Sequence, residues 1–262
     1  MLQTLRKRIH DGSAAAETEQ PWASSVWLAG LTCTEETFAI KAGAQRHAAA
    51  HDLILVTPDT SPRGTGIDGA TADWDFGEGA GFYLDAAEAP WSSRFRMESY
   101  VTRDLIDLLV AQFGVDRARI SIFGHSMGGH GALTLALRHP GMFRSVSALA
   151  PIASPTRCPW GHKAFTHYLC PDRSGWNTHD ASLLMQDTHR PFPDGILIDQ
   201  GLADQFLEEQ LLPEAFESAC RHADQPLTLR RHAGYDHGYY FVASFCADHI
   251  AFHANALNAI TG

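Results

Sequence analysis

The stretch ISIFGHSMGGHGALTL, residues 120–135, places Ser126 among four glycines, between an apolar run of strand length and a run with helical spacing. At a sharp turn from strand to helix, the residues two positions before and after a nucleophilic serine must be small, because they approach neighbouring elements. Gly124 and Gly128 occupy these positions, and Gly129 allows the helix to begin close to the strand. The N–H groups at the start of that helix favour negative charge near the serine. The pattern predicts a nucleophile elbow, G-x-S-x-G; the alternative is a glycine-rich turn whose serine only caps the helix.

The composition favours one globular domain that binds a small molecule. The chain has 262 residues, of which 45% are hydrophobic and 19% charged, so it can bury a sizeable core. Its formal net charge is −10, from 20 basic and 30 acidic side chains, and it contains no run of five lysines or arginines. We therefore expect no binding to nucleic acid or to a membrane surface, and a small molecule as the partner.

The cysteines indicate a reducing compartment. Their number is odd, they are scattered, and a chain of this length needs no disulfides for stability, so we expect thiols. The positions are Cys33, Cys158, Cys170, Cys220 and Cys246. No stretch approaches the length of a membrane span, and the first 22 residues lack the apolar core of a signal peptide. The sequence predicts a cytoplasmic protein.

Fifteen histidines raise the question of a metal site. The best candidate set is Cys158, His162, His167 and Cys170, but its C-x3-H-x4-H-x2-C spacing matches none of the usual paired-ligand patterns. We expect ordinary histidines and thiols at these positions, and no metal.

Strands and helices alternate along the chain. Short apolar or β-branched runs predict strands at residues 26–30, 53–59, 119–125, 145–151, 195–200 and 227–232. Helical spacing predicts helices at residues 35–51, 95–114, 127–139 and 206–222. The alternation predicts an α/β fold with a mostly parallel sheet flanked by helices on both faces. Residues 60–93 and 152–194 are too long for ordinary connections, so we expect two functional excursions over one end of the sheet.

A nucleophile elbow requires an acid and a histidine, which in this fold follow the serine in that order, on loops after later strands. Asp204 lies in the loop after a predicted strand and is favoured over Asp199, which lies within that strand. His237 follows the last predicted strand and is favoured over His232, which lies inside it. The predicted triad is therefore Ser126, Asp204 and His237, with Asp199 and His232 as alternatives.

An oxyanion hole needs two N–H donors, one from the residue after the nucleophile and one from the loop after an earlier strand. The first is Met127. The second is Leu31, because Gly30 before it gives the backbone freedom to aim that N–H; a plain strand-to-helix turn is the alternative. Cys33 follows two residues later and either lies near the acyl pocket or is simply packed.

Several long motifs carry a family resemblance. They are GLTCTEETFAIKAGAQRHAA (30–49), DTSPRG (59–64), DFGEGAGFYLDA (75–86), GHSMGGHGALTLAL (124–137), PIASPTRCPWGHKAF (151–165) and DQGLADQF (199–206). From about Val26 onward the chain resembles the S-formylglutathione hydrolase (esterase D) family, thioesterases of the α/β-hydrolase fold. The resemblance places that family's triad on Ser126, Asp204 and His237, and its oxyanion donors on Leu31 and Met127.

The resemblance implies hydrolysis of S-formylglutathione to glutathione and formate, the second half of glutathione-dependent formaldehyde removal, by a homodimer without metal or organic cofactor. Polar and aromatic groups of the two excursions, Trp160 among them, are expected to line the substrate pocket together with Cys33. The alternatives are a general short-chain carboxylesterase or acyltransferase on the same scaffold, and a noncatalytic binding protein that keeps the elbow for its shape.

The N-terminus departs from the family. Members begin with additional strands and a run like VLYWLSGLT, whereas residues 1–25 resemble nothing in that region and SSVWLAGLT joins abruptly. We therefore divide the chain into an atypical segment, 1–25, and a single α/β-hydrolase domain, 26–262. Without those early strands, the strand around residues 24–30 is expected to have an unpaired edge.

Overall fold

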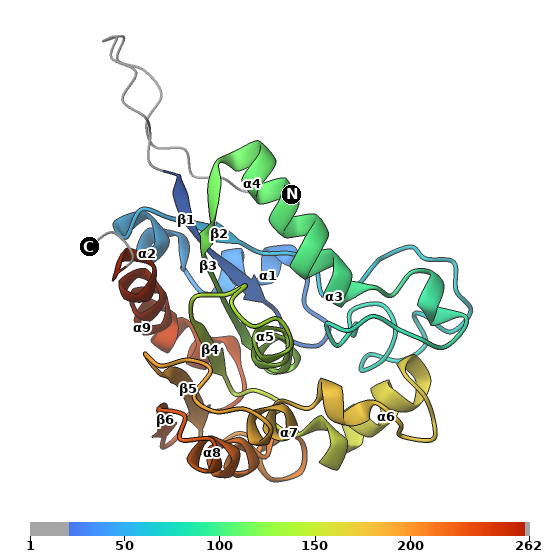
Figure 1. Cartoon of the computed structure of the whole chain (residues 1–262). Helices are drawn as coiled ribbons and strands as arrows, with labels where there is room; N and C mark the ends of the chain where they lie inside the picture. Colours follow the sequence, from blue (N-terminus) through green and yellow to red (C-terminus); the bar gives the residue numbers. More distant parts are fainter. Residues whose placement is uncertain (1–20, 260–262) are drawn as a thin grey trace.

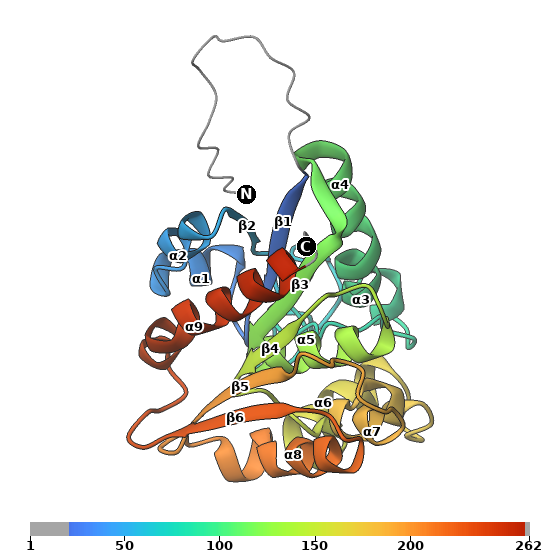
Figure 2. The same cartoon turned by 60° about the vertical axis from the view of Figure 1, so that its left-hand side comes forward.

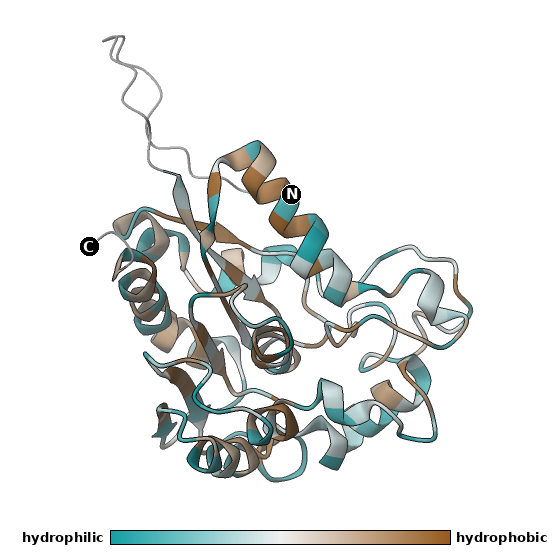
Figure 3. Cartoon of the chain, viewed as in Figure 1, coloured by the Kyte–Doolittle hydropathy of each residue, from teal (hydrophilic) through white to brown (hydrophobic). Residues whose placement is uncertain are grey.

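The computed structural model describes residues 21–259, and at its centre is a six-stranded parallel sheet with the order β2-β1-β3-β4-β5-β6 (Figure 1). The strands are β1 (Trp22–Leu28), β2 (Leu53–Val56), β3 (Val115–His125), β4 (Val146–Leu149), β5 (Ile196–Gly201) and β6 (Leu227–His232). The central strands are mainly hydrophobic (Figure 3), as expected for a sheet buried on both faces. The predicted α/β fold with a mostly parallel sheet is confirmed.

Helices cover both faces of the sheet (Figure 2). They are α1 (Glu35–Lys41), α2 (Gln45–Ala50), α3 (Met97–Ser99), α4 (Ile106–Phe113), α5 (Met127–Arg138), α6 (Pro159–Tyr168), α7 (Ala181–Gln186), α8 (Pro213–His222) and α9 (Tyr239–Asn258). Helix α5 packs on β1, β3 and β4 from one side, whereas α9 packs on β1, β3, β4 and β5 from the other. Within residues 21–259, none of the helices has the length and apolar character required to cross a bilayer.

The first strand begins earlier than the sequence predicts. The expected strand started at residue 26, but β1 begins at Trp22, and its two serines are buried. Ser25 Oγ lies 2.7 Å from Ser121 Oγ of β3, and Ser24 Oγ donates to the Ile54 carbonyl of β2 at 3.2 Å. These paired hydroxyls allow a polar stretch to lie inside the sheet. The expected boundary after residue 25 therefore falls within β1, and residues 1–20 of the expected N-terminal segment lie outside the described range.

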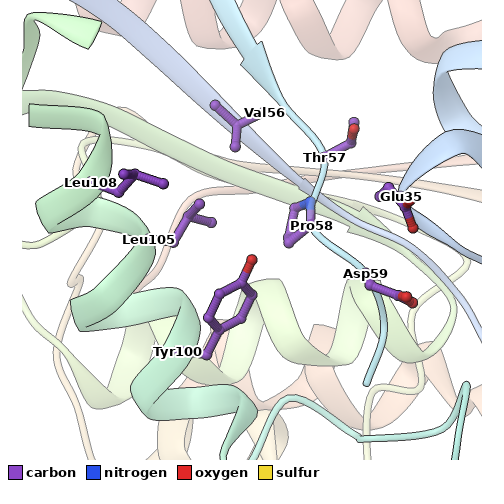
Figure 4. A pocket seen from close by; sticks show the side chains of 8 residues that line it. All are labelled: Glu35, Val56, Thr57, Pro58, Asp59, Tyr100, Leu105 and Leu108. Atoms are coloured by element: carbon purple, nitrogen blue, oxygen red, sulfur yellow. The ribbon is translucent and has the colours of Figure 1, made fainter. Parts of the chain in front are cut away.

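The prediction of an unpaired edge at residues 24–30 is wrong, because β1 lies between β2 and β3. Among the described strands the edge on this side is β2. A cavity of about 300 Å³ lies beside the end of β2, against α4 and the helical turn before it (Figure 4). It is lined by Glu35, Val56, Thr57, Pro58, Asp59, Tyr100, Leu105 and Leu108. None of these residues belongs to the predicted triad.

Three predicted helices are interrupted. The helix expected at 35–51 breaks at Gly43, whose φ is 62°, into α1 and α2. The helix expected at 95–114 contains a π-helical turn, Tyr100–Leu105, between α3 and α4. The helix expected at 206–222 consists of a π-helical turn, Leu207–Leu211, followed by α8. Spacing alone does not reveal such breaks, because the apolar residues remain on one side of each segment.

The two excursions pack against each other. The hydroxyl of Tyr168, at the end of α6, accepts a hydrogen bond from the Gly77 N–H at 3.0 Å and donates to the Ala80 carbonyl at 3.1 Å. The Lys163 ammonium lies 2.5 Å from a carboxylate oxygen of Asp75. Residues 60–93 leave the sheet after β2 and residues 152–194 after β4, so both extend from its carboxyl end. Together they form one layer at that end of the sheet.

Candidate active site

Each predicted site residue follows a strand at the carboxyl end of the sheet. Leu31 follows β1, Ser126 follows β3, Asp204 follows β5 and His237 follows β6. In parallel α/β sheets the carboxyl ends of the strands are where ligands bind. The parallel arrangement of the strands therefore brings residues that are far apart in the sequence to the same end of the sheet.

Ser126 lies in a strained backbone conformation. Its φ is 58° and its ψ is −120°, values that a residue with a side chain rarely adopts. Its N–H donates to the Leu149 carbonyl at 3.0 Å, and its own carbonyl accepts from the His130 N–H at 2.9 Å and the Ile152 N–H at 3.2 Å. These bonds to β4, to the loop after it and to α5 hold the strained turn in place.

The glycines of the elbow are required by close approach. A Cβ on Gly124 would lie 2.3 Å from the Gly128 carbonyl oxygen, and a Cβ on Gly128 would lie 1.9 Å from the Leu28 carbonyl oxygen. A Cβ on Gly30 would already contact Cβ of Ser126 at 3.2 Å, so the loop after β1 lies directly against the serine. The small residues that the sequence pattern marks are therefore needed for packing.

The structure brings Asp204 and His237 together. His237 Nδ1 lies 2.5 Å from Asp204 Oδ2, and the Asp204 side chain is fully buried. The other carboxylate oxygen accepts the Phe206 N–H at 2.9 Å. Because an ionised carboxylate only accepts hydrogen bonds, Nδ1 of His237 must carry the hydrogen. Nε2 is left as the basic nitrogen, which is the tautomer a general base requires.

Two backbone hydrogen bonds align the loops that carry this pair. The Leu202 N–H donates to the His232 carbonyl and the Ala203 N–H to the Tyr235 carbonyl, both at 2.9 Å. The Asp204 loop is therefore joined directly to the segment that leads into His237.

The two alternatives that the sequence leaves open pair with each other instead. Asp199 Oδ1 lies 2.8 Å from His232 Nε2, and the same carboxylate bonds to Arg230 and His249. Burial by itself would raise the pKa of Asp199, but the hydrogen bonds from His249 and Arg230 hold it well below its usual value. The geometry therefore separates a buried polar cluster around Asp199 from the His237 pair.

The loop that carries Leu31 is held by the first excursion. The Tyr83 hydroxyl donates to the Ala29 carbonyl at 2.9 Å, and the Thr32 N–H donates to the Gly79 carbonyl at 2.9 Å. Burial raises the pKa of Tyr83 well above its usual value, so it remains a donor. The backbone is thus fixed on both sides of Leu31.

Further along the same loop, the Cys33 carbonyl accepts from Thr60 Oγ1 at 2.7 Å and from Arg63 Nη2 at 2.9 Å. Arg63 Nη2 in turn lies 2.8 Å from Asp59 Oδ1, and this hydrogen bond raises the pKa of Arg63. The hydrogen bonds of the described range, 21–259, include none from the N–H of Leu31 or of Met127. Both predicted donors are therefore available. Sequence reasoning missed these supports, although DTSPRG was among the motifs of the resemblance.

A row of aromatic rings leads away from His237. The Phe206 ring stands edge-on to the His237 ring at a centroid distance of 5.0 Å, and the Trp160 ring lies 4.7 Å from Phe206. Trp74 stands edge-on to Trp160 at 5.8 Å and is 57% exposed, whereas Trp160 is buried. Trp160 is thus one ring removed from His237. Phe206 and Trp74 were not singled out from the sequence; the position of Phe206 two residues after Asp204 is the signal that could have identified it.

Cys33 lies beside the first turn of α9. Its sulfur is 3.9 Å from the hydroxyl of Tyr239, whose pKa is raised by burial. His125, the residue before the serine, lies with its ring 4.5 Å from that of His237. Burial and the neighbouring His237 lower the pKa of His125 well below its usual value, so His125 is neutral at neutral pH.

Three of the four residues considered for a metal have other contacts. Cys158 Sγ accepts the Gly161 N–H at 3.4 Å at the start of α6, and burial raises the pKa of its thiol to about 11. His162 Nε2 lies 2.6 Å from the Thr156 carbonyl oxygen, and His167 packs on the Phe76 ring. Nowhere between residues 21 and 259 do three potential ligands converge on a point where a metal ion could be held.

Comparisons with known proteins agree with this geometry. The sequence pattern of the family described as "Putative esterase" matches residues 16–252. The chain is 55% identical to the S-formylglutathione hydrolase of Rattus norvegicus over 234 residues, which cover 89% of this chain and 83% of the relative. It is 52% identical to the S-formylglutathione hydrolase of Arabidopsis thaliana, over 88% of this chain and 81% of the relative.

A solved structure of an S-formylglutathione hydrolase from Agrobacterium tumefaciens superposes with a TM-score of 0.88 at 48% identity, covering 92% of this chain and 86% of the other. A ferulic acid esterase at 21% identity, with a TM-score of 0.68, shares the fold. The chain therefore has the α/β-hydrolase fold and belongs to the S-formylglutathione hydrolase family.

Proposed function

We propose that this chain hydrolyses S-formylglutathione to glutathione and formate, with Ser126 as nucleophile, His237 as general base and acid, and Asp204 as the partner of His237. The observation that carries the proposal is the 2.5 Å contact between His237 Nδ1 and Asp204 Oδ2. This contact lies at the carboxyl end of the sheet, where the strained turn at Ser126 also lies. The names of the relatives that match 88–89% of this chain supply the substrate.

In the acylation step, Ser126 Oγ attacks the formyl carbon while its proton moves to Nε2 of His237. The former carbonyl oxygen becomes negatively charged and accepts hydrogen bonds from the N–H groups of Leu31 and Met127, each worth about 3 kcal/mol in the transition state. The C–S bond then breaks, and the proton on His237 passes to the glutathione sulfur. The products of this step are a formyl ester on Ser126 and free glutathione.

Deacylation uses the same groups. Water attacks the formyl carbon while His237 accepts one of its protons, and the same two N–H groups hold the oxyanion. The bond between the formyl carbon and Ser126 Oγ breaks, and His237 returns the proton to the serine. Formic acid leaves and ionises to formate, and the free enzyme is restored. Neither step calls for a metal ion or an organic cofactor.

The glutathione part of the substrate is assigned to the two excursions, which carry aromatic rings and charges beside the site. Trp74 is exposed and offers apolar surface, and the buried Trp160 supports it from below. The Lys163 ammonium of the second excursion lies 2.9 Å from Asp73 and 2.5 Å from Asp75 of the first. Because these two aspartates flank Trp74 in the sequence, the ion pairs fix the segment that carries Trp74. Binding energy from this remote part of the substrate should raise kcat as well as affinity.

The experiment that tests the function compares kcat/KM for S-formylglutathione with that for aryl formates and acetates. We expect the thioester to be preferred by at least about two decades, equivalent to about 2.7 kcal/mol of transition-state stabilisation. Activity should also fall steeply with acyl length, because each methylene that overpacks a formyl-sized pocket costs free energy. Ser126→Ala is the control for background hydrolysis.

Comparable kcat/KM values for S-formylglutathione, aryl formates and acetates, or a preference for butyrate and longer esters, would favour the general carboxylesterase instead. A fluorophosphonate probe separates both enzymes from a noncatalytic binding protein, since only an activated serine reacts with it. Labelling at Ser126 that is lost in His237→Ala is the expected result.

We also infer a cytoplasmic homodimer built from a single α/β-hydrolase domain that includes all of β1, Trp22–Leu28, with an atypical segment before it. The cytoplasmic location is supported by five free thiols. The dimer is what the family resemblance implies. Sedimentation equilibrium tests the dimer, cell fractionation tests the location, and one cooperative unfolding transition is expected of one domain.

A further inference from the structure

Asp199, near the end of β5, is a fully buried carboxylate with a complete set of donors. Arg230 bonds to both of its oxygens from β6, with Nε at 2.6 Å and Nη2 at 2.5 Å. His232 Nε2 lies 2.8 Å from Oδ1, also from β6, and His249 Nε2 lies 3.0 Å from Oδ2, from α9. One carboxylate therefore joins the last strand of the sheet to the last helix.

The contact with α9 continues as a buried relay. His249 Nδ1 lies 2.7 Å from Ser147 Oγ, which lies 2.8 Å from His253 Nε2. His253 Nδ1 lies 2.8 Å from Ser145 Oγ. The ionised Asp199 accepts from His249 Nε2–H, so Nδ1 of that ring must accept from Ser147, and the same alternation applies to the next ring. Every donor and acceptor in the relay is satisfied with both histidines neutral, which makes it a well-defined arrangement.

These contacts lie on both sides of the segment that carries His237. Residues 233–238 connect β6, which ends at His232, with α9, which begins at Tyr239. His232 has two attachments: its ring bonds to Asp199, and its carbonyl accepts the Leu202 N–H of the Asp204 loop. The Phe245 ring of α9 stacks on the His232 ring at 3.9 Å. The strand before the segment and the helix after it are therefore locked together.

We propose that Asp199 is a positioning residue for His237: through His232 and His249 it holds both flanks of the 233–238 segment, and so aligns Nε2 of His237 with Ser126. The proposal rests on the proposed function, in which His237 is the catalytic base. Asp199 itself exchanges no proton with His237, whose Nδ1 bonds to Asp204. A small displacement of a catalytic group costs far more in rate than in binding, because proton transfer requires close alignment. Loss of Asp199 should therefore lower kcat and leave KM nearly unchanged.

The experiment measures turnover for each active site. The concentration of competent sites is first determined by fluorophosphonate labelling at Ser126, and turnover of S-formylglutathione and of an aryl formate is then divided by that number. For Asp199→Asn we expect kcat per labelled site to fall about tenfold or more on both substrates, with KM within about threefold of the wild type. A carboxylate that only stabilised the fold would reduce the number of labelled sites and leave turnover per site unchanged.

A second pair of variants applies if Asp199→Asn fails to fold. His249→Leu removes the donor from α9, whereas His249→Gln retains an amide N–H at the distance of Nε2. We expect about a tenfold loss per labelled site in His249→Leu and rescue to within about threefold in His249→Gln. The matched control is Asp248→Asn, which removes the 52% exposed partner of Arg230 and should stay within about twofold of the wild type.

The outcomes separate the two proposals. If the wild type does not label at Ser126, the proposed catalytic serine is wrong. If the wild type labels but prefers aryl esters, the substrate is wrong and the test of Asp199 still holds on the aryl formate. If the wild type labels, and Asp199→Asn or His249→Leu turns over at the wild-type rate per labelled site, the positioning role of Asp199 is overturned.

Discussion

Ser126 is held at a φ of 58° by contacts that leave no room for side chains around it. Gly128 lies against the Leu28 and Ala29 carbonyls, in the stretch that leads from β1 to the Leu31 loop. The same close approach therefore places the nucleophile and one predicted oxyanion donor beside each other. At the scale of single residues, the site depends on the absence of two Cβ atoms as much as on the presence of functional groups.

Gly128→Ala should lower both stability and activity. Its Cβ would lie 1.9 Å from the Leu28 carbonyl oxygen, so backbone must move, and we expect a loss of about 3 kcal/mol or more in the free energy of unfolding. Gly114→Ala is the control, because Gly114 has a φ of 64° and a Cβ there would meet nothing within 4 Å, so only the left-handed backbone is penalised, by about 1–2 kcal/mol. Urea denaturation gives both values; equal losses would refute the packing argument.

Asp204→Asn should leave the fold intact and reduce kcat about 10⁴-fold, because an amide favours the wrong tautomer of His237. Asp107→Asn, at a side chain 59% exposed on α4, is the matched control and should keep wild-type kcat. Circular dichroism spectra first establish that each variant has the wild-type fold, and kcat is then compared by steady-state kinetics. A value for Asp204→Asn within tenfold of the wild type would contradict its role as the partner of His237.

At the scale of elements, buried histidines are concentrated on the two helices that sandwich the sheet. His130 belongs to α5, and His249 and His253 belong to α9. All three are at most 1% exposed, and burial lowers the pKa of each; that of His130 falls to about 4. His249 and His253 join α9 to Ser147 of β4, and His249 also to Asp199 of β5, whereas His130 bonds to Thr134 of its own helix. All three rings must remain uncharged in the fold.

Stability should therefore fall in mild acid. A histidine with a lowered pKa stays neutral in the fold, whereas in the unfolded chain it takes up a proton below about pH 6.5. The contribution of each neutral histidine to the free energy of unfolding is complete above that pH. It is lost as the pH falls toward the pKa of the histidine in the fold, by about 1.4 kcal/mol per pH unit for each histidine. Urea titrations between pH 7.5 and 4.5 measure this slope.

His130→Gln removes one of these titrating groups, so the slope in that variant should be shallower by about 1.4 kcal/mol per pH unit. A free energy of unfolding that is constant between pH 7.5 and 5 would show that the buried rings do not control acid stability.

At the scale of the whole molecule, the excursions after β2 and β4 meet over the carboxyl end of the sheet and hold the loop that carries Leu31. The contact between Tyr83 and Ala29 spans 54 positions of sequence, and that between Lys163 and Asp75 spans 88. The site is therefore assembled from all parts of the described chain. All five cysteines lie within residues 21–259 and are free, so no disulfide contributes to the assembly of this part of the chain.

The thiols should differ sharply in reactivity. Cys33 and Cys170 are partly exposed, whereas Cys158, Cys220 and Cys246 are buried, and burial raises the pKa of Cys220 to about 12. Ellman's reagent should therefore react quickly with at most the two partly exposed thiols of the native protein, and with all five in guanidinium chloride. Cys33→Ser and Cys170→Ser should each remove one fast equivalent. Fewer than five equivalents in unreduced denatured protein would reveal a disulfide and contradict the structure.

The sequence by itself determined the alternation of strands and helices, the elbow at Ser126 and the small set of acids and histidines downstream of it. These features depend on local spacing: apolar periodicity for the elements, and glycines at fixed offsets for the turn. The same spacing could not reveal that β1 begins at Trp22, because its serines pair with partners on other strands.

The sequence favoured Asp204 as the partner of His237, but only the tertiary structure established that contact and what Asp199 does. Asp199 lies within the apolar run and Asp204 in the loop after it, which favours Asp204, but no local pattern shows which side chains either carboxylate contacts. The pairing of Asp199 with His232, and of Asp204 with His237, depends on the register of β5 and β6 and on the position of α9. The physical reason is that a buried carboxylate must find its donors on other elements, and only packing brings those elements together.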